Sequence, residues 1–208
     1  MARRWFGYGR WGASYWFVGQ EPGGDELDAC VRAWHQLGEE ELLDVQEGHQ
    51  WHDCDLFSEV AGTQRTWAKL IWLVRTFEGK EPSREATLQY QKRDLGRKDG
   101  KTALIELSAL PAHHNGAPVP REMFRSERIA TIRERVLEYK PGFVVFYSSN
   151  RDYRQAWNAI AGVELQREAP VKVGKTVFVM TYHPSRERSK AYWGGIANKL
   201  QTLEGAKH

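Results

Sequence analysis

The sequence predicts an α/β protein, a three-layer α/β/α sandwich around a central sheet of four parallel strands. Four short apolar runs are separated by segments whose apolar residues recur with helical spacing, which is the alternation typical of parallel sheets. These runs are apolar at nearly every position, as strands buried on both faces are. The chain of 208 residues has the length of one domain, so we expect a single domain over residues 1–208.

The elements follow in chain order. The four predicted strands are residues 14–18, 102–107, 143–147 and 176–182. Helices are predicted where a capping residue precedes an apolar stripe and a glycine or proline ends it. They run from Asp25 to Gly38, over 63–77, from Ser83 to about 94, from Ser126 to Pro141, from Asn150 to about 160, and over about 190–203. Residues 39–62 are predicted to be irregular, and 163–173 to form an edge strand or hairpin.

Composition restricts the class of protein. The longest apolar runs have five to seven residues, which is too short to cross a membrane. The basic N-terminus lacks the apolar region of a secretory signal. Two cysteines, Cys30 and Cys54, supply neither a disulfide framework nor a four-cysteine cluster. We therefore expect a cytoplasmic protein with reduced thiols, and a monomer.

Charge is distributed unevenly along the chain. Residues 1–120 carry 14 basic and 18 acidic side chains, a net charge of −4, whereas residues 121–208 carry 16 and 9, a net charge of +7. The basic C-terminal part favours a polyanionic partner such as nucleic acid, although a solvated basic surface has the same composition. Residues 21–59 contain twelve acidic side chains and one basic side chain, so a nucleic acid would avoid most of that segment.

Two loops carry the strongest chemical signals. Ligands of parallel sheets bind beyond the carboxyl ends of the strands. The first predicted strand leads into GQEPGG, residues 19–24, and the last leads into HPS, residues 183–185. A carboxylate such as Glu21 can orient water or stabilise a cation, and His183 can donate a hydrogen bond to a developing anion. Taken singly, Glu21 could equally cap a helix, and His183 could be a loop residue without a chemical role.

Together, GQEPGG and HPS resemble the two signature motifs of the uracil-DNA glycosylase superfamily. The resemblance spans residues 14 to about 203. It implies an enzyme that needs no cofactor and no metal and that hydrolyses the N-glycosidic bond of a deaminated or damaged base in single- or double-stranded DNA. It also implies that Glu21 positions the attacking water, that Gln20 lies beside the base, and that His183 binds a carbonyl oxygen of the leaving base.

The sequence departs from the family pattern at the second strand, which in the family ends with an asparagine that reads the base. Here Glu106 or Ser108 stands at that end, and Asn115 lies farther along as an alternative reader. An ionised glutamate only accepts hydrogen bonds, which favours a base with an amino group over uracil. The four cysteines that hold an iron–sulfur cluster in one branch are also absent.

The resemblance further suggests a DNA-binding surface. Residues matched to the backbone-binding loops, or placed to contact phosphates or the gap left by a flipped base, are Gly23, Pro184, Ser185, Arg186, Arg188 and Lys190. Trp51 and Phe57 lie in the acidic segment and are candidates to stack on a flipped base, but they could equally pack in the core.

Two alternative functions remain open. A protein with the same pocket could recognise an altered base or nucleotide without cutting. Alternatively, the segment from His49 to Asp55 contains several metal-competent side chains, which would suit a metal-dependent hydrolase, although its spacing matches no known zinc finger.

Overall fold

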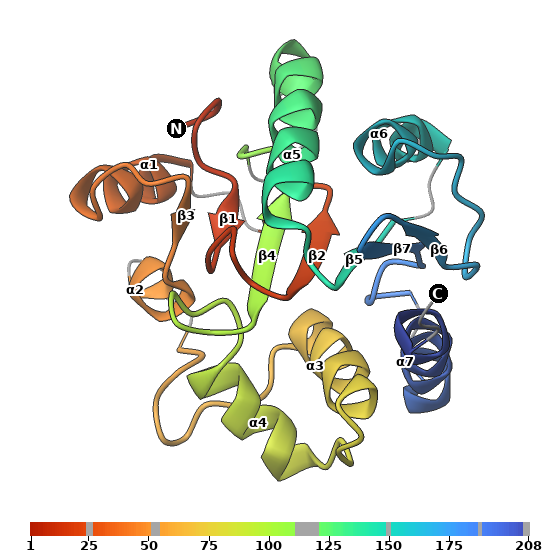
Figure 1. The fold of residues 1–208 in the computed structure, drawn as a ribbon. Helices are drawn as coiled ribbons and strands as arrows, with labels where there is room; N and C mark the ends of the chain where they lie inside the picture. Colours follow the sequence, from red (N-terminus) through yellow and green to blue (C-terminus); the bar gives the residue numbers. More distant parts are fainter. Residues whose placement is uncertain (24–26, 51–54, 111–120, 149–150, 187–188, 206–208) are drawn as a thin grey trace.

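The structure is a computed structural model that describes residues 1–23, 27–50, 55–110, 121–148, 151–186 and 189–205 (Figure 1). The chain forms an α/β fold. The strands are β1 (Gly7–Tyr8), β2 (Tyr15–Gly19), β3 (Leu42–Leu43), β4 (Thr102–Glu106), β5 (Phe143–Phe146), β6 (Val171–Val173) and β7 (Thr176–Met180). The helices are α1 (Leu27–Gln36), α2 (Val45–His49), α3 (Arg65–Phe77), α4 (Arg84–Arg93), η1 (Arg121–Phe124), α5 (Arg125–Tyr139), α6 (Arg151–Ala161) and α7 (Lys190–Gly205).

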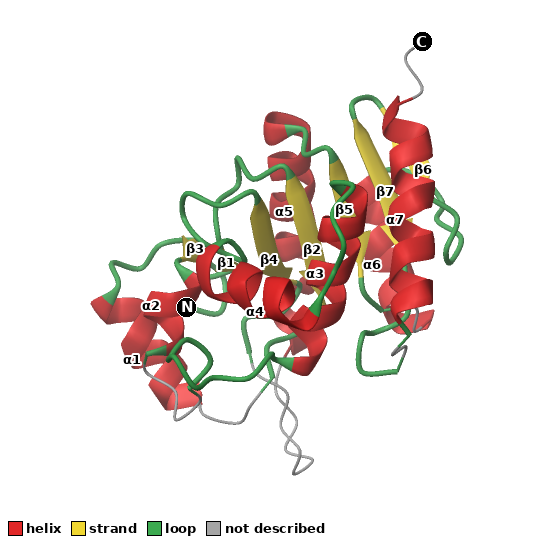
Figure 2. Cartoon of the chain, turned by 90° about the horizontal axis from the view of Figure 1, so that it is seen from below, coloured by secondary structure: helices red, strands yellow, loops and turns green. Residues whose placement is uncertain are grey.

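The sheet is larger than predicted. Within the described part of the chain it has seven strands in the order β3-β1-β4-β2-β5-β7-β6, and it is mixed. The four predicted strands are present as β4, β2, β5 and β7, which pair in parallel and lie side by side in Figure 2. The prediction of four strands was wrong because β1 and β3 have only two residues each, too few for a periodic pattern. β6 pairs antiparallel with β7, as an edge strand.

Helices cover both faces of the sheet, α5 and α6 on one and α3 and α7 on the other (Figure 1). Successive strand residues alternate between the faces, so each parallel strand buries apolar side chains on both. In β2, for example, Trp16 and Val18 pack in the cluster that includes α5 and α6, while Phe17 packs against α3 and α7. This explains the near-continuous apolar runs in the sequence.

The sequence predicted the first residue of some helices correctly and of others incorrectly. The Ser83 side chain caps α4 as expected, because its hydroxyl accepts the backbone N–H of Ala86. The predicted start of α5 was wrong: the helix begins at Arg125, so Ser126 lies inside its first turn and does not cap it. The segment predicted to be irregular contains β3 and α2. The predicted caps Asp25 and Asn150 lie outside the described residues.

The parallel pairing brings the carboxyl ends of β4, β2, β5 and β7 to one edge of the sheet. The loops that follow these strands therefore meet there. Among the described residues, no helix is both long and apolar enough to span a lipid bilayer.

Candidate functional site

The centre of this edge is a close contact of Glu106, Tyr147 and Gly19. Register places Gly19, the last residue of β2, opposite Glu106, the last of β4. The Tyr147 hydroxyl, just beyond β5, donates a 3.0 Å hydrogen bond to Oε1 of Glu106. A Cβ on Gly19 would lie under 3.0 Å from both the Tyr147 hydroxyl and Oε2 of Glu106. The first glycine of GQEPGG is therefore required by the side chains that pack over it.

The carboxyl group of Glu106 is buried, although the residue as a whole is half-buried. Burial, assisted by the negative charge of Glu21, raises the pKa of Glu106 to about 8, although the Tyr147 hydrogen bond and Arg128 act in the opposite direction. Burial and Glu106 together raise the pKa of Tyr147 well above its usual range. At neutral pH both groups carry their protons. Oε2 of Glu106 has no hydrogen-bond partner among the described residues.

Gln20 ties the loop after β2 to its neighbours. Its side-chain amide donates to the Ser148 hydroxyl beyond β5, and its backbone carbonyl accepts the N–H of Ser108 at 2.9 Å. The Ser108 hydroxyl accepts the N–H of Leu110 at 3.1 Å. The Ser108 side chain thus braces its own loop, whereas the Glu106 side chain reaches Tyr147 beyond β5.

His183 follows β7 and is held in one orientation. Its Nδ1 accepts the backbone N–H of Ser185 at 3.1 Å and lies 2.7 Å from the Ser185 hydroxyl. An acceptor Nδ1 leaves the proton of the neutral ring on Nε2. Burial, followed by the charge of Arg186, lowers the pKa of His183, which favours this neutral donor form. The His183 ring lies 5.7 Å from the Tyr147 ring, centroid to centroid.

The other residues of the two motifs are placed as follows. Glu21 is half-buried directly after β2 and acts electrostatically on Glu106. Gly23 is exposed, and a Cβ there would meet no atom of the described residues within 4 Å, so their packing does not require a glycine. Pro184 is buried behind His183. Tyr147 therefore contacts both Glu106 and His183, and Glu21 lies near enough to Glu106 to act on its charge.

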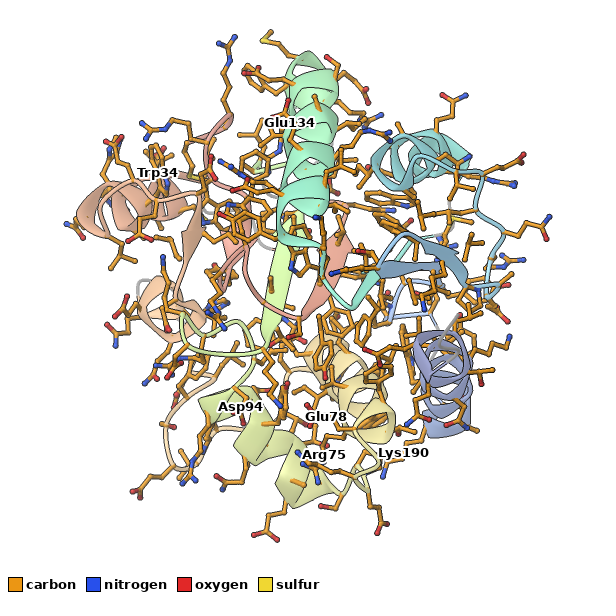
Figure 3. The ribbon with its side chains drawn as sticks, viewed as in Figure 1. Trp34, Arg75, Glu78, Asp94, Glu134 and Lys190 are labelled. Carbon is orange, nitrogen blue, oxygen red and sulfur yellow. The ribbon has the colours of Figure 1, made fainter. Side chains whose placement is uncertain are left out.

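The candidate DNA-binding side chains do not all point the same way. Arg186 is exposed next to His183. The Lys190 ammonium instead donates to the Pro82 carbonyl at 3.0 Å and lies 5.4 Å from the ring centre of Trp72, toward α3 and α4 (Figure 3). Its contacts therefore attach the start of α7 to the helical layer. Arg188 lies outside the described residues.

Phe57 belongs to an aromatic cluster. Its ring centre lies 6.1 Å from that of His49 and 6.3 Å from that of Trp67. These contacts hold Phe57 among core side chains, which agrees with the packing alternative. The candidates Trp51 and Asn115 lie outside the described residues.

The described part of the His49–Asp55 segment serves local structure. Nδ1 of His49 lies 2.9 Å from the Val45 carbonyl of its own helix, and Asp55 accepts the backbone N–H of Ser58 at 2.9 Å. In the described ranges no three His, Cys, Asp or Glu side chains are grouped closely enough to hold a metal ion. Residues 51–54 of the segment lie outside the described residues.

Sequence reasoning missed the buried Arg128 of α5. Its guanidinium donates to the carbonyl oxygens of Leu107 at 2.7 Å and Glu106 at 2.7 Å, at the end of β4. It also donates to the carbonyls of Ala2 and Trp5 near the N-terminus, at 3.0 and 2.9 Å. Burial lowers its pKa to about 10, so it stays charged at neutral pH. Arg128 therefore fixes the backbone from which the Glu106 side chain projects.

A cavity of about 260 Å³ lies at the opposite edge of the sheet, where Lys101 precedes β4. Its charged lining includes Arg75, Glu78 and Asp94, which Figure 3 shows beside α3 and α4. Glu78 pairs with Lys80 at 2.7 Å and with Lys101 at 3.5 Å. Glu78 is thus compensated by two lysines of the same lining.

Comparison with known proteins identifies no relative: no family model matches the chain, and no curated protein matches it. The functional assignment therefore depends on the sequence motifs and the geometry of the site.

Proposed function

We propose that the protein is a DNA glycosylase that hydrolyses the N-glycosidic bond of a deaminated or damaged base. The observation that supports this most directly is the convergence at one sheet edge of the loops bearing Glu21, Glu106 and His183, linked by the Tyr147 contacts. In an α/β sheet this edge is where ligands bind. The two motifs that resemble the uracil-DNA glycosylase superfamily both end there.

The reaction assigns separate tasks to the carboxylate and the imidazole. The C1′–N bond breaks, its electron pair leaves with the base, and the sugar becomes an oxocarbenium-like cation. The negative charge of Glu21 stabilises that cation, and Glu21 takes a proton from the water that adds to C1′. The neutral His183 ring donates its Nε2–H to the carbonyl oxygen on which the leaving base accumulates negative charge.

Binding to DNA is supported by charge. Residues 121–208 carry a net charge of +7, and the exposed Arg186 directly follows HPS, with its backbone N–H bonded to the His183 carbonyl at 2.8 Å. A target base inside a duplex must be flipped out to reach such a site, and a cation beside the opening would contact the phosphates that flank it.

The experiment is single-turnover base release from oligonucleotides that contain uracil, hypoxanthine, xanthine or a thymine mismatch. Glu21→Gln keeps the size of the side chain but removes its charge and basicity, so we expect a rate loss of about a hundredfold to ten-thousandfold with DNA affinity retained. His183→Ala should cost on the order of a hundredfold or more.

Glu85→Gln, on the exposed surface of α4, is the matched control and should leave the rate unchanged. If the wild-type protein binds such DNA but releases no base, the site only recognises the base, and the enzyme proposal is wrong. If Glu21→Gln cuts at the wild-type rate, Glu21 has no chemical role.

A further inference from the structure

We propose that Glu106 reads the target base as a neutral carboxylic acid, with Oε2 donating a hydrogen bond to a carbonyl of the base and Oε1 accepting one from the adjacent ring N–H. This inference rests on the proposed function and extends it to the class of base. It also replaces the expectation from sequence that Glu106 acts only as an acceptor.

The first argument is the environment of the carboxyl group. Among the described residues Glu106 forms no ion pair, and the groups that face it are Tyr147 just beyond β5, Glu21 from the loop after β2, Tyr8 from β1 and Arg128 from α5. Burial and Glu21 oppose a negative charge on Glu106, and they outweigh the hydrogen bond from Tyr147 and the charge of Arg128, which favour it. Arg128 is the only cation, and its donors are directed to backbone carbonyls.

The second argument is the position of the proton within the carboxyl group. The Tyr147 hydroxyl donates to Oε1, so Oε1 is the carbonyl oxygen and Oε2 carries the proton. A carbonyl oxygen has two lone pairs, and Tyr147 uses one of them. The acid thus presents one acceptor and one donor side by side, the same pair that an asparagine or glutamine amide presents.

The third argument is that Oε2 is buried with no partner among the described residues. A buried donor without a hydrogen bond is unfavourable, and a ligand that accepts from it removes that penalty. Gly19 permits the close approach of the strands at this point, because a side chain there would displace Oε2. The donor is thus preformed at the edge where Glu21 and His183 converge.

This pattern selects a chemical class. Deamination converts the amino donor and ring-nitrogen acceptor of cytosine or adenine into a carbonyl acceptor and a ring N–H donor. Uracil, hypoxanthine and xanthine therefore match a neutral Glu106, whereas cytosine and adenine place donor against donor and acceptor against acceptor. Thymine and guanine share the carbonyl and N–H pair, so their exclusion depends on other groups of the site.

The test compares wild type, Glu106→Gln and Glu106→Ala in single-turnover release of uracil between pH 6 and 9.5. Glutamine carries the donor and acceptor permanently, so it should retain activity, whereas alanine should lose at least tenfold at pH 7. With a pKa of about 8, the neutral fraction of Glu106 falls about tenfold between pH 7 and 9. The ratio of the wild-type rate to the Gln rate should fall by the same factor.

This ratio cancels the ionisation of uracil itself and of His183, because both enzymes share them. A ratio that stays constant from pH 6 to 9.5, or a Gln variant as impaired as the Ala variant, would overturn the role of Glu106 even though base release continues.

If the wild-type protein releases no base, the proposed function fails, and the same ratio is measured for binding of free uracil by calorimetry. If the wild-type affinity for uracil falls relative to that of Glu106→Gln as pH rises, Glu106 reads the base as proposed. If the two affinities change with pH in the same way, or neither protein binds uracil, this role is excluded.

Discussion

The raised pKa of Glu106 has a consequence for stability that does not depend on any function. Its pKa is about 8 in the folded protein against 4.5 for an unperturbed glutamate. Between these values the unfolded chain has released the proton and the folded protein still holds it. Unfolding then releases a proton, so the free energy of unfolding falls as pH rises through this window and levels off above about pH 8.

The size of the effect follows from the width of the window. One pKa unit corresponds to about 1.4 kcal/mol, and the window of about 3.5 units between 4.5 and 8 gives a loss of roughly 5 kcal/mol by pH 8. This is an appreciable part of the stability of an ordinary domain. Glu106→Gln keeps an acceptor for the Tyr147 hydroxyl and cannot ionise, so its stability lacks this pH dependence.

The measurement is urea denaturation of wild type and Glu106→Gln at intervals from pH 4.5 to 9. The difference between the two curves removes the contribution of all other titrating groups that the substitution leaves unaffected. The variant should gain on the wild type steadily up to about pH 8 and then hold a constant advantage. Curves that run parallel over this range would mean that the Glu106 carboxyl is solvated or paired in solution, and the reasoning from its burial would be refuted.

Three further substitutions test the geometry of the site. Gly19→Ala places a methyl group against the Tyr147 hydroxyl and Glu106 Oε2, so it should cost about 1–3 kcal/mol in urea denaturation and reduce base release. Arg128→Met removes the donors of four backbone carbonyls and should cost at least about 3 kcal/mol, with a mild loss contradicting its clamping role. Replacing Arg186 and Arg188 by Ala should weaken DNA binding and flatten its dependence on log salt by about one unit of slope per lost phosphate contact, whereas an unchanged salt series would place them outside the interface.

Much of the fold could be predicted because its central strands leave an unambiguous pattern. A strand buried on both faces is apolar throughout, and the four parallel strands have this property. β1 and β3 have two residues each, and they are strands because they pair with each other and β1 pairs with β4, so their own composition does not reveal them. The helix α2 left a usable signal in Asp44, whose carboxylate accepts the N–H groups of Gln46 and Glu47, within a segment whose acidity suggested a loop.

Part of the candidate site could likewise be predicted from the sequence, and part of it could not. The convergence of Glu21, Glu106 and His183 follows from strand order and the parallel-sheet rule. Tyr147 has the sequence pattern of the end of an apolar strand, and the sequence does not reveal that its hydroxyl reaches across β2 to Glu106. Arg128 sits among charged residues in the sequence and resembles a surface side chain. Its spacing of four from Ile132, a buried residue of α5, places it on the inward face, which is the signal that could have found it.

The arrangement of Arg128 also accounts for the chemistry available to Glu106. A guanidinium that paired with the carboxylate would hold Glu106 in its ionised form and leave only acceptors at the end of β4. Here the Arg128 donors are used by backbone carbonyls, including that of Glu106 itself. The cation therefore fixes the position of the strand end without neutralising the carboxyl group, and burial beside Glu21 keeps the proton on it. With Tyr147 donating to Oε1, the protonated Glu106 can present a donor and an acceptor side by side, as an amide does.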